Sequence, residues 1–100
     1  MAEQEHQIEI ARAEEEGRGA FFVERQGIRL AEMTYSRVSD NLVIVDHTEV
    51  NDKLRGLGVG RKLLDALVSW ARESHTKIIA TCPYAKAQFE RDASIRDVLS

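Results

Sequence analysis

Hydrophobic and polar residues alternate through the first half of the chain, and a period of two is typical of β-strands. The pattern predicts four strands, at 7–11, at 20–24, from 28 to the polar turn at 39–41, and at 42–50. Charged or glycine-containing turns at 14–19 and 26–27 separate the first three. Because these connections are short, we expect the four strands to form an antiparallel meander.

The hydrophobic period changes after residue 58. Leucines at positions 63, 64 and 67 recur at helical spacing together with Trp70, which predicts a helix over 58–74 with Trp70 in the core. A fifth strand is expected at 77–81 and a second helix around 85–91. Two strands joined by a crossover helix lie parallel, with a right-handed connection.

These elements predict an α+β fold with a mixed, mainly antiparallel sheet and one βαβ unit. With 43% hydrophobic and 31% charged residues, the composition is that of an ordinary globular protein. No long linker divides the 100 residues, so we expect a single domain over 1–100, with residues 1–6 disordered.

Three glycines, Gly56, Gly58 and Gly60, fall at the junction between the fourth strand and the first helix. Glycine lets a backbone approach a ligand closely, and the free N–H groups of a helix's first turn then face a phosphate. Neither the G-x-G-x-x-G dinucleotide pattern nor the P-loop pattern is present. The segment predicts a cradle for another phosphorylated cofactor; the alternative is a glycine turn that only packs the helix close to the sheet.

The spacing Arg55-x-x-Gly58-x-Gly60 resembles the (Arg/Gln)-x-x-Gly-x-(Gly/Ala) pyrophosphate loop of the GNAT superfamily, the acyl-CoA-dependent N-acyltransferases. His-Thr-Glu-Val at 47–50 and Cys-Pro-Tyr at 82–84 resemble its small, single-domain Yjdj-type branch, and the resemblance covers about residues 19 to 90. It implies that strands four and five splay apart, that the pantetheine arm of CoA lies in the gap, and that the pyrophosphate rests on the glycine loop.

The chain departs from that branch at two places. Asn51 and Asp52 stand where the branch usually has a proline after the fourth strand. Asp-Ala-Ser-Ile at 92–95 replaces a His-Pro-Glu-Tyr-like segment that could line the acceptor side. The second departure affects the expected acceptor more than the expected cofactor.

The resemblance implies that acetyl-CoA or coenzyme A is held largely by the backbone of this loop. The motif is matched directly by Arg55, Gly58 and Gly60, and neighbouring residues would contribute backbone N–H groups. The full set of expected cofactor-binding residues is Val50, Arg55, Gly56, Leu57, Gly58, Val59, Gly60 and Arg61.

His47 and Glu49 are two positions apart in a strand, so their side chains project from one face near its C-terminal end. Acetyl transfer to an amine needs a base, and a carboxylate or imidazole can remove the proton directly or through water. Because some members of the superfamily use a fourth-strand glutamate, the resemblance makes Glu49 the leading candidate and His47 the second. The alternative is that they are ordinary sheet-face residues.

Cys82 and Tyr84 follow the fifth strand, and in the superfamily plan Cys82 lies beside the thioester. Cys82 is either a nucleophile that accepts the acetyl group, with His47 helping across the gap, or a buried residue in an enzyme that transfers directly. Tyr84 is the candidate to protonate the leaving CoA thiolate, and packing against the second helix is the alternative.

Charge and cysteine count restrict the partners. A net charge of −3 argues against a broad nucleic-acid surface, and a single cysteine rules out an internal disulfide. No metal site is predicted. Without a bilayer-length apolar run or a secretory signal, we expect a cytoplasmic protein with no membrane partner, as a monomer or weak homodimer.

The leading functional prediction is an acetyl-CoA-dependent N-acetyltransferase acting on an amine, either a small amine or a protein lysine. The second prediction is an acyl-CoA-binding module with little or no transferase activity. A structural domain with a glycine-rich turn is the third and weakest.

Overall fold

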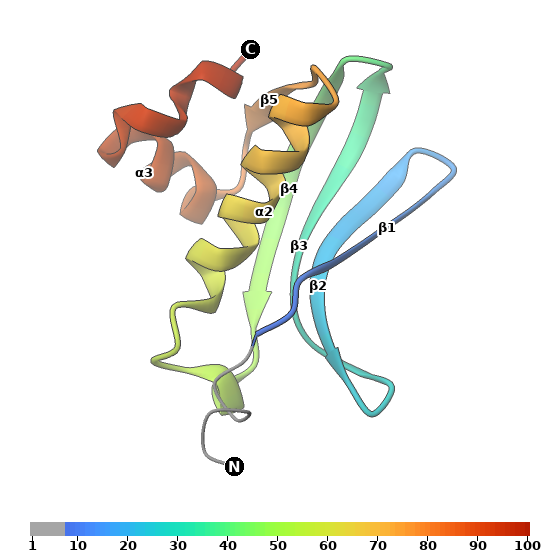
Figure 1. Cartoon of the computed structure of the whole chain (residues 1–100), viewed down its shortest axis with the longest axis vertical. Helices are drawn as coiled ribbons and strands as arrows, with labels where there is room; N and C mark the ends of the chain where they lie inside the picture. Colours follow the sequence, from blue (N-terminus) through green and yellow to red (C-terminus); the bar gives the residue numbers. More distant parts are fainter. Residues whose placement is uncertain (1–7) are drawn as a thin grey trace.

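The computed structural model describes residues 8–100, which form one five-stranded sheet with two α-helices and two short 3-10 helices (Figure 1). In chain order, the strands are β1 (Ala11–Glu15), β2 (Arg18–Arg25), β3 (Ile28–Ser39), β4 (Leu42–Val50) and β5 (Lys77–Ala80). The helices are η1 (Asp52–Leu54), α2 (Val59–Glu73), α3 (Pro83–Arg91) and η2 (Ala93–Val98). The predicted disorder of residues 1–6 falls outside the described residues.

The sheet has the predicted mixed topology. Its strands lie in chain order, from β1 at one edge to β5 at the other. The pairs from β1 to β4 are antiparallel, and β4 and β5 are parallel. This arrangement confirms the α+β fold, with a meander followed by a βαβ unit around α2.

The first strand was predicted at the wrong place. The sequence pattern gave a strand over 7–11 and a turn over 14–19, whereas β1 occupies Ala11–Glu15. The turn is centred on Glu16 and Gly17, whose φ angles are 53° and 81°. Residue 7 lies outside the described residues, and residues 8–10 precede the strand.

Contacts with distant parts of the chain explain why the charged segment is a strand. Glu14 accepts hydrogen bonds from Arg37 Nε at 2.6 Å and from the Tyr35 hydroxyl at 2.8 Å. Arg12 donates to the same hydroxyl at 2.8 Å, and its guanidinium lies 4.9 Å from the Trp70 ring centroid. Trp70 is only partly buried, at the rim of the core rather than inside it, and stacks on Tyr35.

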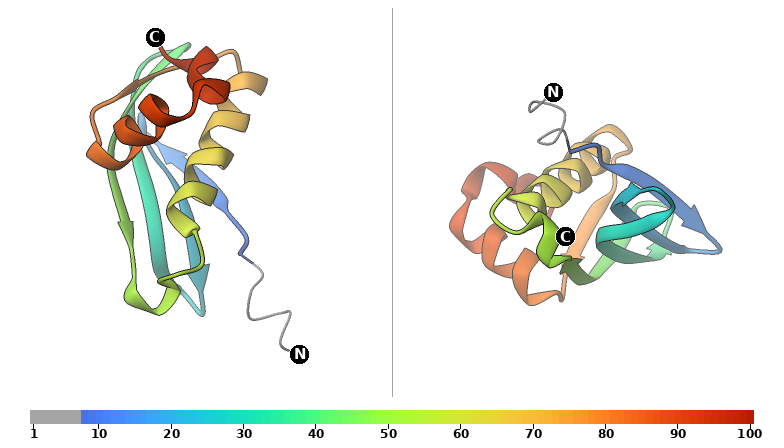
Figure 2. Two further views of the ribbon diagram at one scale, coloured as in Figure 1. Left: turned by 90° about the vertical axis from the view of Figure 1, so that its left-hand side faces the viewer. Right: turned by 90° about the horizontal axis from the view of Figure 1, so that it is seen from below.

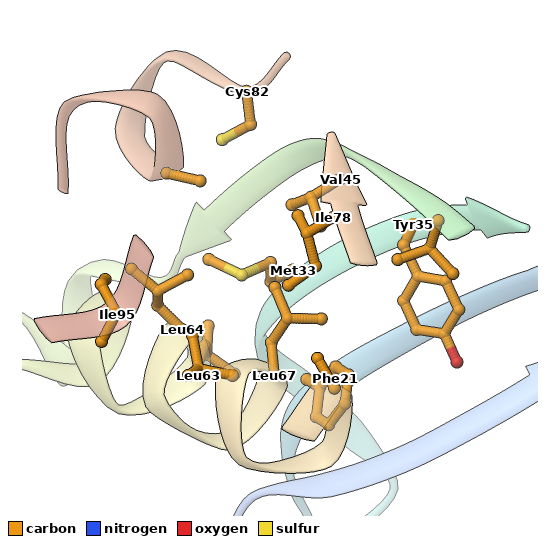
Figure 3. Packing of buried hydrophobic residues seen from close by; sticks show 14 of the residues in the cluster. Phe21, Met33, Tyr35, Val45, Leu63, Leu64, Leu67, Ile78, Cys82 and Ile95 are labelled. Atoms are coloured by element: carbon orange, nitrogen blue, oxygen red, sulfur yellow. The ribbon is translucent and has the colours of Figure 1, made fainter. Parts of the chain in front are cut away.

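The helix α2 lies across one face of the sheet and closes the main core (Figure 1). Its leucines Leu63, Leu64 and Leu67 are fully buried together with Met33 and Val45 of the sheet (Figure 3). The apolar positions of α2 recur at helical spacing, so one face of the helix is buried. Replacing one of these leucines with alanine would cost about 2–5 kcal/mol in stability.

The helices α3 and η2 lie beside α2, next to β5 (Figure 2). The second predicted helix exists but begins at Pro83, and η2 was not predicted. Phe89 of α3 and Ile95 and Val98 of η2 are buried in the same core. No helix among residues 8–100 combines the length and the apolar character needed to cross a bilayer.

A β-bulge interrupts the pairing of β3 with β4. Thr34 is opposite His47, whereas Tyr35 is opposite Val45, so Asp46 is an extra residue in β4. The Thr34 hydroxyl donates a hydrogen bond to the Asp46 carboxylate at 2.6 Å and holds the extra residue in place. A bulge bends its strand, and this one lies where β4 parts from β5.

The strand β4 extends beyond its parallel partner. The last paired residues are Val45 and Ala80, but β4 continues to Val50. The backbone N–H groups of Thr81 and Cys82 both donate to the Val45 carbonyl, at 3.0 and 3.1 Å, as the chain turns out of the sheet. The last part of β4 therefore has no β5 partner within the described residues.

Candidate functional site

The glycine loop is anchored by η1. Asn51 caps this short helix by accepting a hydrogen bond from the Lys53 N–H at 2.8 Å, and Leu54 is buried in the core. Asp52 accepts a hydrogen bond from the exposed guanidinium of Arg55 at 2.6 Å. Asn51 and Asp52, which stand where the branch usually has a proline, thus have a local structural role.

The loop residues Gly56 and Gly58 have left-handed backbones, with φ angles of 83° and 67°. A Cβ atom built on either residue would meet nothing within 4 Å. Glycine is therefore favoured here by the backbone conformation and not by a crowding neighbour. The side-chain positions of both residues are uncrowded, and a ligand such as a phosphate can approach a glycine backbone closely.

The first turn of α2 presents free backbone donors beside these glycines. The first i to i−4 hydrogen bond runs from the Lys62 N–H to the Gly58 carbonyl at 3.1 Å. The N–H groups of Val59, Gly60 and Arg61 therefore lie outside the helical ladder. Free N–H groups at the positive end of a helix dipole can bind an anion, and the predicted pyrophosphate loop lies at this helix start.

At position 60, glycine is favoured by a close neighbour and not by the backbone conformation. A Cβ atom there would lie 3.1 Å from both the ring carbon Cζ and the hydroxyl oxygen of Tyr84. Its absence lets the first turn of α3 approach the glycine loop. Gly60 therefore brings Tyr84 next to the predicted cofactor site.

The Tyr84 hydroxyl lies beside Gly60 in the first turn of α2. It has no hydrogen-bond partner among the residues that the structure describes. Burial raises the pKa of Tyr84 above its ordinary value, and the charge of Arg61 opposes this rise only in part. The phenol is therefore protonated at neutral pH.

The other predicted cofactor residues differ in their surroundings. Val50 and Leu57 are partly buried against the core, and Val59 is almost fully buried, so these three can offer mainly backbone groups. The side chain of Arg61 is hydrogen-bonded to Gln88 of α3 at 3.0 Å. Its backbone N–H remains available at the start of α2.

His47 and Glu49 lie on one face of β4, as predicted. Their Nε2 and Oε1 atoms are 3.3 Å apart, and the two side chains are 53% and 72% exposed. Glu32 is directly opposite Glu49 on β3, and potential ligand atoms of all three residues lie within 4.8 Å of one another. The sequence analysis missed Glu32 because a cross-strand neighbour depends on the register of the sheet.

Cys82 is 2% exposed and is hydrogen-bonded to Thr48, not to His47. The Thr48 Oγ1 and Cys82 Sγ atoms are 3.0 Å apart. Thr48 lies between His47 and Glu49 in the strand, so its side chain points to the opposite face. The expectation that His47 assists the thiol is therefore wrong, because strand alternation separates the two.

The fold and the glycine loop agree with the match to known families. Residues 20–98 match the family model of the GCN5-related N-acetyl-transferases. This match covers most of the chain, and the chain belongs to that family. None of the curated proteins matches it.

One solved structure gives the same assignment, and a more distant one shares the fold. A GCN5-like protein from Staphylococcus aureus, studied by NMR, is 42% identical, with a TM-score of 0.68 over 93% of this chain and 88% of that chain. The ribosomal-protein-alanine N-acetyltransferase of Brucella melitensis biovar Abortus is 20% identical, with a TM-score of 0.60 over 77% and 62% of the two chains.

A GNAT family acetyltransferase from Elizabethkingia anophelis, whose crystal structure contains acetyl-CoA, is 12% identical. Its TM-score is 0.53 over 64% of this chain and 42% of that chain. At this level of identity, the likeness concerns the fold.

Proposed function

We propose that the chain is an acetyl-CoA-dependent N-acetyltransferase that acts on an amine. The observation that carries this proposal is the glycine loop itself. Gly56 and Gly58 have left-handed backbones with uncrowded side-chain positions, and they come just before the first-turn N–H groups of α2, which lie outside the helical ladder. The loop adjoins the end of β4 that has no β5 partner, in a chain of the GCN5-related family. These residues fit the pyrophosphate of CoA, for which they supply backbone donors and a favourable dipole.

In this proposal, some site residues bind the cofactor and others transfer protons. When bound, acetyl-CoA would supply a thioester as the acetyl donor. The backbone N–H groups of Val59, Gly60 and Arg61 would hold its pyrophosphate. Glu49 Oε1 or Oε2 would remove a proton from the amine, directly or through water, and the Tyr84 hydroxyl would donate a proton to the leaving thiolate.

The surroundings of Cys82 favour direct transfer. Its thiol is almost inaccessible and is hydrogen-bonded to Thr48, while His47 pairs with Glu49 on the other face. Nucleophilic catalysis by cysteine needs an accessible thiolate with a neighbouring base or cation. Direct attack of the amine needs only a base, and the exposed Glu49 can act as one.

The exposure of Glu49 and His47 bears on the acceptor. Both side chains are more than half exposed on an open sheet face, with Glu32 beside them. A pair of carboxylates attracts a cationic amine, and an exposed base can be reached by an amine on a large molecule. We therefore favour a lysine presented on a protein surface over a small amine that would need an enclosing pocket.

Mass spectrometry of a cell extract incubated with the protein and acetyl-CoA tests the proposal. We expect new acetyl-lysine sites that the Glu49→Gln variant produces much more slowly. A protein that binds CoA but acetylates neither proteins nor small amines in the extract would instead be an acyl-CoA-binding module.

A further inference from the structure

We propose that Arg61 is a positioning residue, which fixes α3 against the start of α2 and thereby sets the place of the Tyr84 hydroxyl beside the glycine loop. The role of Tyr84 as a proton donor rests on the proposed function. The position of Tyr84 in the free protein does not, and it can be tested separately.

The guanidinium of Arg61 binds three acceptors from two helices. Its Nε donates to Asp65 in the next turn of α2 at 2.9 Å. Its Nη1 donates to Gln88 of α3 at 3.0 Å, and its Nη2 donates to Asp92 at the end of α3 at 2.5 Å. A planar guanidinium can satisfy these three directions at once, whereas a lysine ammonium is a single point of charge on a flexible stem.

Asp92 is itself fixed by a second set of contacts. Its Oδ2 atom binds Arg61, while its Oδ1 atom accepts hydrogen bonds from the Ser94 N–H at 2.9 Å and the Ser94 hydroxyl at 2.6 Å. Asp92 is both the N-cap of η2 and the C-cap of α3, and its backbone N–H donates to the Gln88 carbonyl. Asp92 and Ser94 belong to the 92–95 segment that departs from the branch, and here this segment anchors Arg61.

The contacts of Gly60 and Arg61 fall on one face of α3. Tyr84 and Gln88 are four residues apart in α3, and Asp92, the C-cap of this helix, follows four residues later, so the three lie in a row along one side. Gly60 leaves room for the Tyr84 ring, and the adjacent Arg61 holds the other two members of the row. Two consecutive residues of α2 thus determine how closely α3 approaches and where its first turn lies.

This arrangement couples the predicted phosphate site to the predicted proton donor. The N–H group of Arg61 belongs to the free first turn of α2, and its side chain ties down the helix that carries Tyr84. Reaction rates are sensitive to a displacement of about 1 Å in a catalytic group. Loss of the Arg61 contacts should therefore move the Tyr84 hydroxyl without removing the backbone donors of the loop.

NMR of the free protein labelled at the Cζ carbon of tyrosine tests the structural part. The chain has two tyrosines, so two signals are expected, and Tyr84→Phe assigns them. We expect Arg61→Lys to shift or broaden the Tyr84 signal and leave that of Tyr35 unchanged. The matched control is Arg72→Lys, because Arg72 pairs α2 with Asp97 of η2 at a distance from the loop. An unchanged Tyr84 signal in a folded Arg61→Lys protein would overturn the proposal.

Kinetics then test the consequence for the reaction. We expect Arg61→Lys to lower kcat by roughly tenfold to hundredfold, with CoA affinity, measured by calorimetry, within about threefold of the parent protein. In a Tyr84→Phe background, Arg61→Lys should lower kcat little further, because the hydroxyl that Arg61 positions is absent. If the decreases in kcat caused by Arg61→Lys and Tyr84→Phe were fully additive, or if CoA affinity fell as much as kcat, the positioning role would be contradicted.

The two levels of the proposal fail in distinguishable ways. If the parent protein transfers no acetyl group, the proposed function fails, but the tyrosine signals still decide whether Arg61 holds Tyr84. If the parent protein is active and Tyr84→Phe has no effect on kcat, Tyr84 is not the proton donor and Arg61 has nothing to position.

Discussion

Gly60 and Tyr84, which are far apart in the sequence, fit together so closely that a Cβ atom on the glycine would lie 3.1 Å from the tyrosine hydroxyl. The close approach joins the first turn of α2 to the first turn of α3. It places a protonated phenol beside the loop that is expected to bind CoA. In the proposed enzyme, the same glycine would bind phosphate through its N–H group, and its missing side chain leaves room for the tyrosine ring.

Gly60→Ala should fold and still bind CoA but turn over more slowly. The backbone of Gly60 is helical, so alanine is tolerated there, but the methyl group must displace the Tyr84 ring by a few tenths of an ångström. We expect kcat to fall by about tenfold, with a smaller change in CoA affinity, in steady-state kinetics and calorimetry. Unchanged kcat in a folded variant would show that the position of this ring is not critical.

CoA should protect the protein against heat, and Gly58→Val should abolish this protection. A ligand that binds only the folded state stabilises it by about 2.7 kcal/mol at a hundredfold excess over its Kd. A branched side chain at Gly58 would strain a left-handed backbone and fill the open space before the loop. Thermal melts with CoA, and with NAD and ATP as comparisons, measure the effect.

Leu57→Ala is the matched control for this loop. Leu57 is partly buried against the core, so its removal should lower the melting temperature slightly and leave the CoA-dependent shift unchanged. A Gly58→Val protein that remains folded and shows the parent shift would place the phosphate site elsewhere.

Glu49→Gln and Cys82→Ala should have unequal effects on turnover. If Glu49 is the base for direct attack, its loss should lower kcat by roughly a hundredfold to ten-thousandfold. Cys82→Ala should leave kcat nearly unchanged and cost some stability, because Cys82 is buried in the core. Kinetics and mass spectrometry of the protein incubated with acetyl-CoA distinguish the routes. An acetyl group on Cys82 that turns over at the catalytic rate would establish the covalent route instead.

Stability should fall in acid partly through Glu14. Hydrogen bonding to Arg37 lowers the pKa of Glu14 from its ordinary 4.5 to about 2, against the opposing effect of burial. Between these values the unfolded chain binds more protons, so Glu14 stabilises the fold above pH 4.5 and loses this effect as the pH falls towards 2. Glu14→Gln should therefore melt at a lower temperature at neutral pH and depend less on pH in this window.

Melting curves between pH 2 and pH 7 check this prediction, with Glu15→Gln as the control, since Glu15 is an exposed neighbour in β1. A parent protein and a Glu14→Gln variant with parallel pH profiles would show that Glu14 is not the group responsible.

Gly19→Ala should destabilise the fold by about 1–3 kcal/mol, as overpacking of a core does. A Cβ atom on Gly19 would lie 2.2 Å from Cζ of Tyr35, and that ring is held by hydrogen bonds to Glu14 and Arg12. Denaturant unfolding measures the loss in free energy of unfolding caused by Gly19→Ala in the parent protein and in a Tyr35→Leu background, where the obstructing ring atoms are absent. An equal loss in both backgrounds would mean that the ring is not the obstacle.

The order of the elements and the place of the glycine loop follow from the sequence by itself. Alternation marks β2 to β4, and helical spacing over 58–74 marks α2 (Val59–Glu73), because each pattern reports which face of a local segment is buried. The loop could be recognised because its left-handed backbone conformation favours glycine at Gly56 and Gly58. These inferences need only residues close together in the chain.

The partners of individual side chains were decided by the tertiary structure. The segment around Glu14 is a strand because of contacts with β3, such as the hydrogen bond from the Tyr35 hydroxyl. Strand alternation makes Thr48, rather than His47, the hydrogen-bond partner of Cys82. Two of the three acceptors of Arg61, Gln88 and Asp92, lie 27 and 31 residues further along the chain. Such contacts depend on how sheet and helices pack, and a local pattern contains no information on that packing. The sequence thus determined where the glycine loop lies, and packing determined which side chains surround it.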